Sequence, residues 1–408
     1  MSAEVKHTAE AARGGKARMK IAIATHLYPT PDRPDLWSDV EALHVFTRQW
    51  LRDGHEVTVL HLYQHVNFDT RKKPPFYRYW INAVELDGVR VIRIECRYIR
   101  RTPPLTWLYF KKIARVVNAM LEGHDILLAH FPTVLHGFAE NLLPGAPRVA
   151  VLHSTDFDNL RRGGAWLLRG LSRTYAAVGF RSTGIRERFH RLVTWNKPEF
   201  MVYSGAPTMP RRAPDRADNG VFRVIYVGKL TLRKRALMVL GALAKLPERI
   251  DWRFTIVGEG DQRAPLEARI GELDVAGKVT LTGMLPRDEV LRLLGEQDAF
   301  AMVSTRETLG LVYLEAMGQG LLTIGSRGEG IDGIIEHGVN GFLADPDDEE
   351  ALIELFIRIA DLPDDEKARI SNAARATASR MNEADMAAEY LRNAAECAGV
   401  KWEGKGTK

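Results

Sequence analysis

The sequence predicts an α/β protein with two domains, each built around a doubly wound parallel sheet. Short apolar runs alternate with segments of helical spacing along most of the 408 residues, and a stretch rich in proline and charge separates two such series. A chain of this length can form two or three complete hydrophobic cores. We therefore place a loose tail at 1–18, a first domain at 19–207, a linker at 208–220, a second domain at 221–384 and a final segment at 385–408.

The first domain begins with a β-α-β unit. Residues 19–25 and 55–60 are apolar runs typical of strands, and 39–52 between them has helical spacing, with Gly54 as its C-cap. Similar strands follow at 125–129, 148–152 and 176–178. Ligands gather at the carboxyl ends of strands in such a sheet. His153 follows one of these ends, where a histidine is either structural or a hydrogen-bond donor to a phosphate or sugar hydroxyl.

The second domain repeats this alternation. Its predicted strands are 222–227, 252–257, 279–282 and 298–303. The first ends at Gly228 and Lys229, with Lys234 shortly after, while the second ends at Gly258 and the third leads to Met284. Because lysines neutralise phosphates and glycines allow close approach of the backbone, this edge of the sheet suits a diphosphate joined to polyol groups.

Glu307 and Glu315 flank the start of a predicted helix after the last of these strands. The free amides at this start point out of the sheet edge, and a helix N-terminus attracts phosphate. These are the amides of Leu309, Gly310, Leu311 and Val312. On one continuous helix the two glutamates would be about 80° out of phase, but with Glu307 in the loop both can border one ligand. Their spacing alone favours two ordinary residues, a glutamate of a surface loop and a glutamate of an amphipathic helix.

Composition excludes several classes of protein. Cys96 and Cys397 are the only cysteines, so no disulfide framework or zinc spacing is available, which favours a reducing cytoplasm. The first residues are charged and lack the apolar core of a signal peptide, and no later apolar run approaches the roughly 18 residues that cross a bilayer. We therefore expect a cytoplasmic protein, soluble or peripheral at a membrane.

Residues 71–115 are basic and aromatic. Their many lysines and arginines face only Glu85, Asp87 and Glu95, and aromatic residues are interleaved with them. This combination suits an anionic lipid surface and also single-stranded nucleic acid. A solvated basic face above core aromatics explains it as well. Of the two functional interpretations, we favour contact with a membrane over contact with nucleic acid.

Taken in order, these residues resemble a known family, the retaining GT-B glycosyltransferases of family 4, also called group 1 glycosyltransferases. The resemblance covers nearly the whole folded chain and is strongest over 224–348. Glu307 and Glu315 match the Glu-x7-Glu motif of the family, with Ala316 and Met317 following as usual. Four further segments resemble family motifs: 228–234 the phosphate-binding G-[RK]-L…RK, 257–260 the V-G-x-G turn, 153–156 the H-x-x-D and 337–343 the D-G-x-N-G-x-L turn.

The resemblance implies two sets of functional residues. The donor-binding set holds a UDP- or GDP-linked sugar and comprises Gly228, Lys229, Lys234, Gly258, Met284, Leu309, Gly310, Leu311, Val312 and Glu315. In this set the lysines bind the diphosphate, Glu315 binds the ribose, and the Met284 loop lies near the base. The catalytic set is Glu307, which holds the hydroxyls of the transferred sugar, and His153, which contacts that sugar from across a cleft.

The resemblance also implies the GT-B fold, in which two Rossmann-like domains face each other across a cleft and a C-terminal helix, here 385–398, returns to the first domain. The domain at 19–207 is then the acceptor side, with possible membrane contact, and the domain at 221–384 is the nucleotide-sugar donor side. The family retains anomeric configuration by a front-face reaction without a protein nucleophile, and no metal or cofactor is expected. Three departures leave the sugar and the acceptor unassigned. The proline-rich 29–37 replaces a Gly-Gly loop, Leu321-Leu322 replaces Pro-Val, and 328–333 replaces a G-G-x-P-E segment.

We therefore expect a glycosyltransferase that moves a sugar from a nucleotide-sugar to a glycan or lipid-linked acceptor, in the synthesis of cell-surface polysaccharide or glycolipid. The expected location is the cytoplasm, with peripheral contact at the inner face of the membrane. Two alternatives remain. The first is a sugar-nucleotide epimerase or phosphorylase of the same fold, and the second is a non-enzymatic protein that binds nucleotides or nucleic acid.

Overall fold

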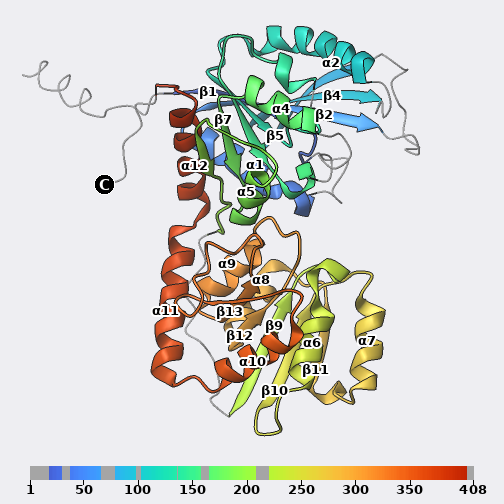
Figure 1. Cartoon of the computed structure of the whole chain (residues 1–408), viewed down its shortest axis with the longest axis vertical. Coiled ribbons are helices and arrows are strands. Elements are labelled where there is room, and N and C mark those ends of the chain that lie inside the picture. Colours follow the sequence, from blue (N-terminus) through green and yellow to red (C-terminus); the bar gives the residue numbers. More distant parts are fainter. Residues whose placement is uncertain are drawn as a thin grey trace, which may run out of the picture. The chain divides into compact units, whose positions relative to one another are not determined.

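The chain forms two compact units (Figure 1). The computed structural model describes residues 18–29, 37–65, 79–97, 103–135, 137–157, 165–207 and 220–401. The N-terminal unit contains the residues up to Gly179, Val193–Phe200 and the segment from Ala387 onward, and the C-terminal unit contains Phe180–Leu192 and Met201–Met386. The expected tail and linker lie outside the described residues, apart from Arg18 and Gly220.

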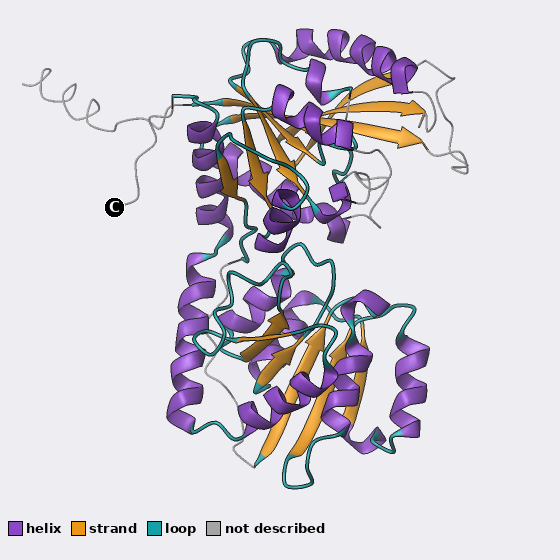
Figure 2. Cartoon of the chain, in the orientation of Figure 1, coloured by secondary structure: helices purple, strands orange, loops and turns teal. Residues whose placement is uncertain are grey.

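The N-terminal unit is built on an eight-stranded sheet with the order β3-β4-β2-β1-β5-β6-β7-β8 (Figure 2). Its strands are β1 Lys20–Thr25, β2 Glu56–His65, β3 Tyr79–Leu86, β4 Val89–Arg97, β5 Ile126–His130, β6 Arg148–Leu152, β7 Ala177–Phe180 and β8 Glu199–Met201. The central strand β1 pairs in parallel with β2 and β5, and only Lys20 of β1 is exposed. Central parallel strands are covered on both faces, which explains their continuous apolar sequence.

The β3–β4 hairpin was not predicted from the sequence. It is antiparallel, so this sheet is mixed and not purely parallel. Asp87 and Gly88 join the two strands with φ angles of 49° and 80°, and an Asp-Gly pair with positive φ is typical of two-residue hairpin turns. Both strands lie in the stretch 71–115, which was interpreted from the sequence as a basic and aromatic surface, and the side chains of β3 are exposed or half-buried.

The helices of this unit are α1 Trp37–Arg52, α2 Pro103–Asn118 and α4 Ala165–Thr174, with 3-10 turns at η2 Ala119–Leu121 and η3 Ala139–Asn141. Helix α12, Glu383–Cys397, begins in the C-terminal unit and continues into the N-terminal unit. There the indole Nε1 of Trp50 donates a 2.7 Å hydrogen bond to the carbonyl of Ala387, and Tyr390 packs against Phe46 and Trp50. The end of the chain thus forms part of the N-terminal core.

The C-terminal unit is built on a six-stranded sheet with the order β11-β10-β9-β12-β13-β14. Its strands are β9 Val221–Val227, β10 Asp251–Val257, β11 Val279–Gly283, β12 Ala299–Ala301, β13 Leu322–Ser326 and β14 Phe342–Ala344, and all their pairings are parallel. Its helices are α5 Thr183–His190, α6 Ala236–Ala244, α7 Arg263–Glu272, α8 Arg287–Gly295, α9 Leu311–Gly318, α10 Glu349–Ala360 and α11 Asp364–Arg380. The predicted α/β class with two wound sheets is confirmed.

Strand β9 lies between β10 and β12, so the strand order reverses at β9. The loops after β9 and β12 leave the sheet on opposite sides of this point. In open α/β sheets, ligands bind in the crevice at such a topological switch point. The fold therefore directs attention to residues 228–235 and 304–310.

The basic and aromatic stretch 71–115 is described only in part, since 71–78 and 98–102 lie outside the described residues. Of its aromatic residues, Tyr109 and Phe110 belong to the core. Leu108, Val116 and the nearby Met120 are instead exposed. In the part of the chain that is described, no helix is long and apolar enough to span a membrane.

Candidate active site

Lys234 and Glu307 form an ion pair at the switch point of the C-terminal sheet. Lys234 ends the short turn η4 Leu232–Lys234 after β9, and Glu307 lies in the loop after β12. A 2.8 Å hydrogen bond from the amide of Thr305 to the carbonyl of Arg233 joins these two loops. The Lys234 Nζ donates to Glu307 Oε2, and each side chain is only 13% exposed. Two residues 73 positions apart in sequence thus neutralise each other at a mostly buried position.

The loop that carries Glu307 is supported by a second loop after β13. The carboxylate of Glu329 accepts a 3.0 Å hydrogen bond from the main-chain amide of Glu307. Gly330 lies so close that a Cβ atom there would be 2.3 Å from the carbonyl oxygen of Thr308. The two loops therefore pack backbone against backbone, and the position of Glu307 depends on both.

Helix α9 starts directly after this loop. Its N-cap is Gly310, which has φ 76° and provides no side-chain hydrogen bond to the helix. The amides at its start are therefore uncapped by a side chain, as expected for an anion-binding terminus. A side chain at Gly310 would be 2.8 Å from the ring of Tyr313, so glycine is required there for both φ and packing.

Glu315 lies on the same helix and is nearly buried. Its carboxylate pairs with Arg287 at the start of α8. Met284, in the loop before α8, is 78% exposed. Arg287 was not among the residues predicted for the site, because its link to Glu315 spans 28 positions and matches no local motif.

The glycines after β9 and β10 let two loops approach each other. A Cβ atom on Gly258 would be 2.0 Å from the carbonyl oxygen of Gly228, and one on Gly260 would be 2.1 Å from that of Leu230. The main-chain carbonyl of Lys229 accepts a 3.1 Å hydrogen bond from the hydroxyl of Tyr226. The side chain of Lys229 is exposed. These glycines are therefore needed for the packing of the two loops. The sequence singles them out for another reason, the close approach of a ligand.

His153 lies in the N-terminal unit, within a chain of hydrogen-bonded side chains. Its Nε2 is 3.0 Å from Nδ1 of His130, whose Nε2 is 2.9 Å from the hydroxyl of Tyr390 on α12. The ring of Phe131 stacks on His153 with a centroid distance of 3.7 Å. The orientation of His153 is therefore set by residues of β5 and of the C-terminal helix. These residues lie outside the sequence motif 153–156.

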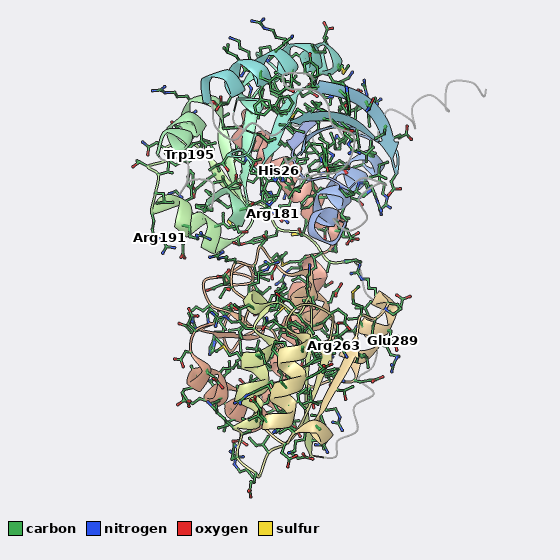
Figure 3. The ribbon with its side chains drawn as sticks, turned by 90° about the vertical axis from the view of Figure 1, so that its right-hand side faces the viewer. His26, Arg181, Arg191, Trp195, Arg263 and Glu289 are labelled. Carbon is green, nitrogen blue, oxygen red and sulfur yellow. The ribbon has the colours of Figure 1, made fainter. Side chains whose placement is uncertain are left out.

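The buried Asp156 bonds to His153, and the half-buried His26 contacts Phe131, whose ring stacks on His153. Asp156 accepts hydrogen bonds from the His153 amide at 2.8 Å and from the amide and hydroxyl of Thr133 at 3.1 and 2.6 Å. Burial raises the pKa of Asp156 to about 6, and these hydrogen bonds partly oppose the shift. His26, labelled in Figure 3, meets the ring of Phe131 edge-on, and burial lowers its pKa to about 4.

The structure therefore places the predicted residues in two groups. The lysines, the α9 terminus, Glu307 and Glu315 belong to the C-terminal unit, whereas His153 belongs to the N-terminal unit. In the described ranges, no cluster of three or more His, Cys, Asp or Glu residues has the arrangement of a metal site.

Comparison with known proteins finds a family match for the C-terminal half of the chain. Residues 211–377 match the family model of glycosyl transferases group 1. An uncharacterized glycosyltransferase of Methanocaldococcus jannaschii, MJ1607, is 27% identical over 82% of this chain and 87% of its own length. The N-acetyl-alpha-D-glucosaminyl L-malate synthase of Bacillus anthracis is 28% identical over 63% of this chain and 70% of its own. The lipopolysaccharide core biosynthesis glycosyltransferase LpsE of Rhizobium meliloti is 32% identical over 33% and 38% of the two chains.

Solved structures agree on the fold. The lipopolysaccharide outer core galactosyltransferase WaaB has a TM-score of 0.70 at 15% identity, covering 92% of this chain and 99% of its own. HepE from Anabaena, in complex with UDP-glucose, has a TM-score of 0.60 at 20% identity, covering 92% and 100%. The fold is the GT-B fold of glycosyltransferases. Residues 211–377 thus match the group 1 glycosyltransferases, the family that the motifs of the sequence resemble.

Proposed function

We propose that this glycosyltransferase moves a sugar from a nucleotide-sugar donor to a glycan or lipid-linked acceptor, with retention of anomeric configuration. The observation that carries the proposal is the Lys234–Glu307 ion pair at the switch point, beside the uncapped start of α9. The comparisons support it: the HepE structure contains UDP-glucose, and LpsE is named for lipopolysaccharide core biosynthesis. Synthesis of a cell-surface polysaccharide or glycolipid is the corresponding process.

In this proposal the C-terminal unit binds the donor. Lys229, Lys234 and the amides at the start of α9 hold the diphosphate, because cations and a helix N-terminus both stabilise negative charge. Gly228 and Gly258 leave room for its approach, and the exposed Met284 contacts the base. Glu315 accepts hydrogen bonds from the ribose hydroxyls while Arg287 holds its carboxylate in place.

Glu307 and His153 are the proposed catalytic residues. When the donor binds, its phosphate replaces Glu307 as the partner of Lys234, and the freed carboxylate accepts hydrogen bonds from the transferred sugar. His153 donates to the same sugar. Lys229 and Lys234 stabilise the negative charge of the leaving diphosphate as it develops, so no metal ion is required for this role.

The reaction then needs no nucleophile from the protein. The bond between the sugar C1 and the phosphate oxygen breaks, and the acceptor oxygen forms a new bond to C1 on the same face of the ring. The acceptor proton moves to the leaving phosphate oxygen. Attack on the face that the leaving group vacates preserves the anomeric configuration.

A donor screen followed by product analysis tests this function. Among UDP-, GDP- and TDP-sugars, we expect one to stabilise the protein against thermal unfolding, by about 2.7 kcal/mol at 100 times its dissociation constant. With that donor and an acceptor, a new glycosidic bond of retained configuration forms, with and without EDTA. Products of epimerisation or of phosphorolysis would instead identify the alternative enzymes of this fold.

Two variants test the residues. Glu307→Ala and Lys234→Ala should each lower kcat by a factor of about 100 or more, because each removes a charge that acts on the transition state. Arg269→Gln on α7 is a matched control, since Arg269 is an exposed arginine of the same unit that pairs with Glu272. Full transfer activity in both alanine variants would refute the assignment of the site.

A further inference from the structure

Glu329 is a second carboxylate beside Glu307, and the proposed reaction gives it no role. It lies in the loop after β13, within residues 328–333, the segment that departs from the family motif. Its Oε2 accepts the 3.0 Å hydrogen bond from the Glu307 amide. Among the described residues Oε1 has no hydrogen-bond partner, and it is not shielded from solvent. One oxygen of this carboxylate is thus fixed to the backbone of Glu307, while the other is open to a ligand.

The loop of Glu329 lies along the backbone that leads into α9. A Cβ atom on Gly330 would be 2.3 Å from the carbonyl oxygen of Thr308 and 2.6 Å from the amide nitrogen of Leu309. The proposed function places the donor diphosphate at the start of this helix. Because the transferred sugar is bonded directly to the diphosphate, it would lie beside the same helix terminus, next to Glu307 and Glu329.

Both carboxylates act on one buried group, the hydroxyl of Tyr313 on α9. Burial raises the pKa of Tyr313, and the negative charges of Glu307 and Glu329 raise it further, whereas the hydrogen bond with Ser304 opposes the shift. The interaction between charges weakens with distance, so both carboxylates lie near this hydroxyl. Tyr313 donates its proton to the carbonyl of Met302, at 2.6 Å, and therefore compensates neither carboxylate.

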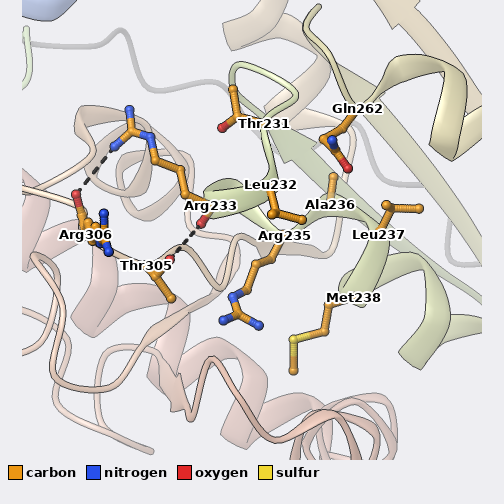
Figure 4. A pocket seen from close by; sticks show the side chains of 10 residues that line it. All are labelled: Thr231, Leu232, Arg233, Arg235, Ala236, Leu237, Met238, Gln262, Thr305 and Arg306. Carbon is orange, nitrogen blue, oxygen red and sulfur yellow. Dashed lines mark hydrogen bonds between the residues drawn. The ribbon is translucent and has the colours of Figure 1, made fainter.

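Positive charge beside the two glutamates is limited. Lys234 pairs with Glu307, but no cation among the described residues forms an ion pair with Glu329. Arg306, which precedes Glu307, is exposed and lines a pocket against the start of α6 (Figure 4). In the proposed reaction the donor phosphate becomes the partner of Lys234. Both glutamates then face the sugar with uncompensated negative charge.

We propose that Glu329 selects the transferred sugar by its charge. Its Oε1 accepts a hydrogen bond from a hydroxyl of that sugar, next to the hydroxyls held by Glu307. Two adjacent carboxylates repel a sugar that carries a carboxylate of its own, and specificity arises from such repulsion as well as from attraction. The inference rests on the proposed function, and it narrows the donor to nucleotide-sugars whose transferred sugar has no acidic group.

Two substitutions separate the charge of Glu329 from its support of the loop. Glu329→Gln removes the charge but keeps a side-chain oxygen that can accept from the Glu307 amide. Glu329→Asp keeps the charge but shortens the side chain, which weakens that hydrogen bond. If Glu329 only supports the loop, the glutamine variant resembles the wild type and the aspartate variant is the impaired one. Glu272→Gln, at an exposed glutamate that ends α7, is the matched control.

Binding is measured by calorimetry on the full chain with three pairs of neutral and acidic donors: UDP-glucose and UDP-glucuronic acid, UDP-galactose and UDP-galacturonic acid, and GDP-mannose and GDP-mannuronic acid. In the pair that binds best, the wild type should bind the neutral donor about tenfold or more tightly than the acidic one. This ratio should fall about threefold or more in Glu329→Gln, because one of two repelling charges is removed. It should stay within about twofold of the wild-type ratio in Glu329→Asp and Glu272→Gln. Free UDP or GDP should bind all four proteins equally.

Three results would overturn the proposal. Equal binding of neutral and acidic donors by the wild type excludes selection by charge, and this comparison needs no variant. An unchanged ratio in Glu329→Gln leaves the residue with support of the loop alone. An equal fall of the ratio in both Glu329 variants assigns the effect to a displaced loop. The proposed function fails separately, if the wild type binds these donors with the expected selectivity but forms a glycosidic bond from none of them.

Discussion

Asp156 and His26 show how single buried groups respond to their surroundings. Each is placed beside the carboxyl ends of strands in the N-terminal unit. Asp156 is fully buried, and His26 is half-buried with its Nδ1 shielded from water. Burial raises the pKa of Asp156 to about 6 and lowers the pKa of His26 to about 4, because it disfavours the charged form of both groups. The ordinary pKa values of aspartate and histidine side chains are about 3.9 and 6.5.

These shifts predict opposite dependences of stability on pH. The native state binds the proton of Asp156 more tightly than the unfolded state does, so its contribution to the free energy of unfolding falls between about pH 4 and pH 6. The native state binds the proton of His26 less tightly, so its contribution rises between about pH 4 and pH 6.5. In the wild type the two contributions largely offset each other.

Substitution of either residue should uncover the contribution of the other. Between pH 4 and pH 6.5, the free energy of unfolding should increase more in Asp156→Asn than in the wild type, by up to about 3 kcal/mol. In His26→Asn, the free energy of unfolding should increase less than in the wild type, and the difference should be of similar size. Urea unfolding at both pH values measures the two differences, and parallel changes in all three proteins would contradict the assigned pKa shifts.

At the scale of elements, the loop after β13 determines where Glu307 lies. Glu329 holds the Glu307 amide, and Gly330 fits against Thr308 without space for a side chain. The same loop also contacts the start of α5. A Cβ atom on Gly184 would be 2.2 Å from the carbonyl oxygen of Gly328. Three backbone segments far apart in sequence are thus stacked behind the proposed catalytic carboxylate.

Gly330→Ala should therefore impair activity more than it impairs the rest of the fold. Its methyl group would be 2.3 Å from the Thr308 carbonyl oxygen, and backbone cannot yield as a flexible side chain can. We expect a loss of about 1–3 kcal/mol in unfolding free energy and a lower kcat. Gly271→Ala on α7 is the control, since nothing lies within 4 Å of its new Cβ atom and alanine favours a helix. Equal activity of the two variants would exclude the supporting role of this loop.

At the scale of the whole molecule, the net charge of +5 is small, and its distribution matters more. On α2, Leu108, Lys112, Arg115 and Val116 are exposed and share one face of the helix by their spacing. A face with both cations and apolar side chains suits an anionic membrane surface. We therefore retain the proposal that the protein associates peripherally with the inner face of the membrane.

Co-sedimentation with vesicles tests this association. The wild type should sediment with vesicles containing anionic phospholipid, and less with purely zwitterionic vesicles or in high salt, because screening weakens attraction to the headgroups. Leu108→Glu should weaken the association. Leu192→Glu, at an exposed leucine of the C-terminal unit, should not. If both variants sediment like the wild type, α2 is not the contact.

The sequence by itself determined the α/β class, most central strands and the resemblance to group 1 glycosyltransferases. These follow from local patterns: strands such as β1 and β9 are apolar because both faces of the sheet are covered, and the Glu307 and Lys234 motifs lie at strand ends. Strands β3 and β4 were missed because they lie in the stretch 71–115, which was interpreted as a basic and aromatic surface. Strands β8, β13 and β14 were not predicted either.

Only the tertiary structure decided which side chains meet. Arg287 reaches Glu315 across 28 positions, Glu329 reaches the Glu307 amide across 22, and Tyr390 reaches His130 across 260. The same holds for the pocket of Arg233, Arg235 and Arg306, which forms where the loops of two adjacent strands meet. Periodicity and motifs report the local environment of a residue, whereas these contacts depend on strand order and on how loops pack, which no local pattern contains.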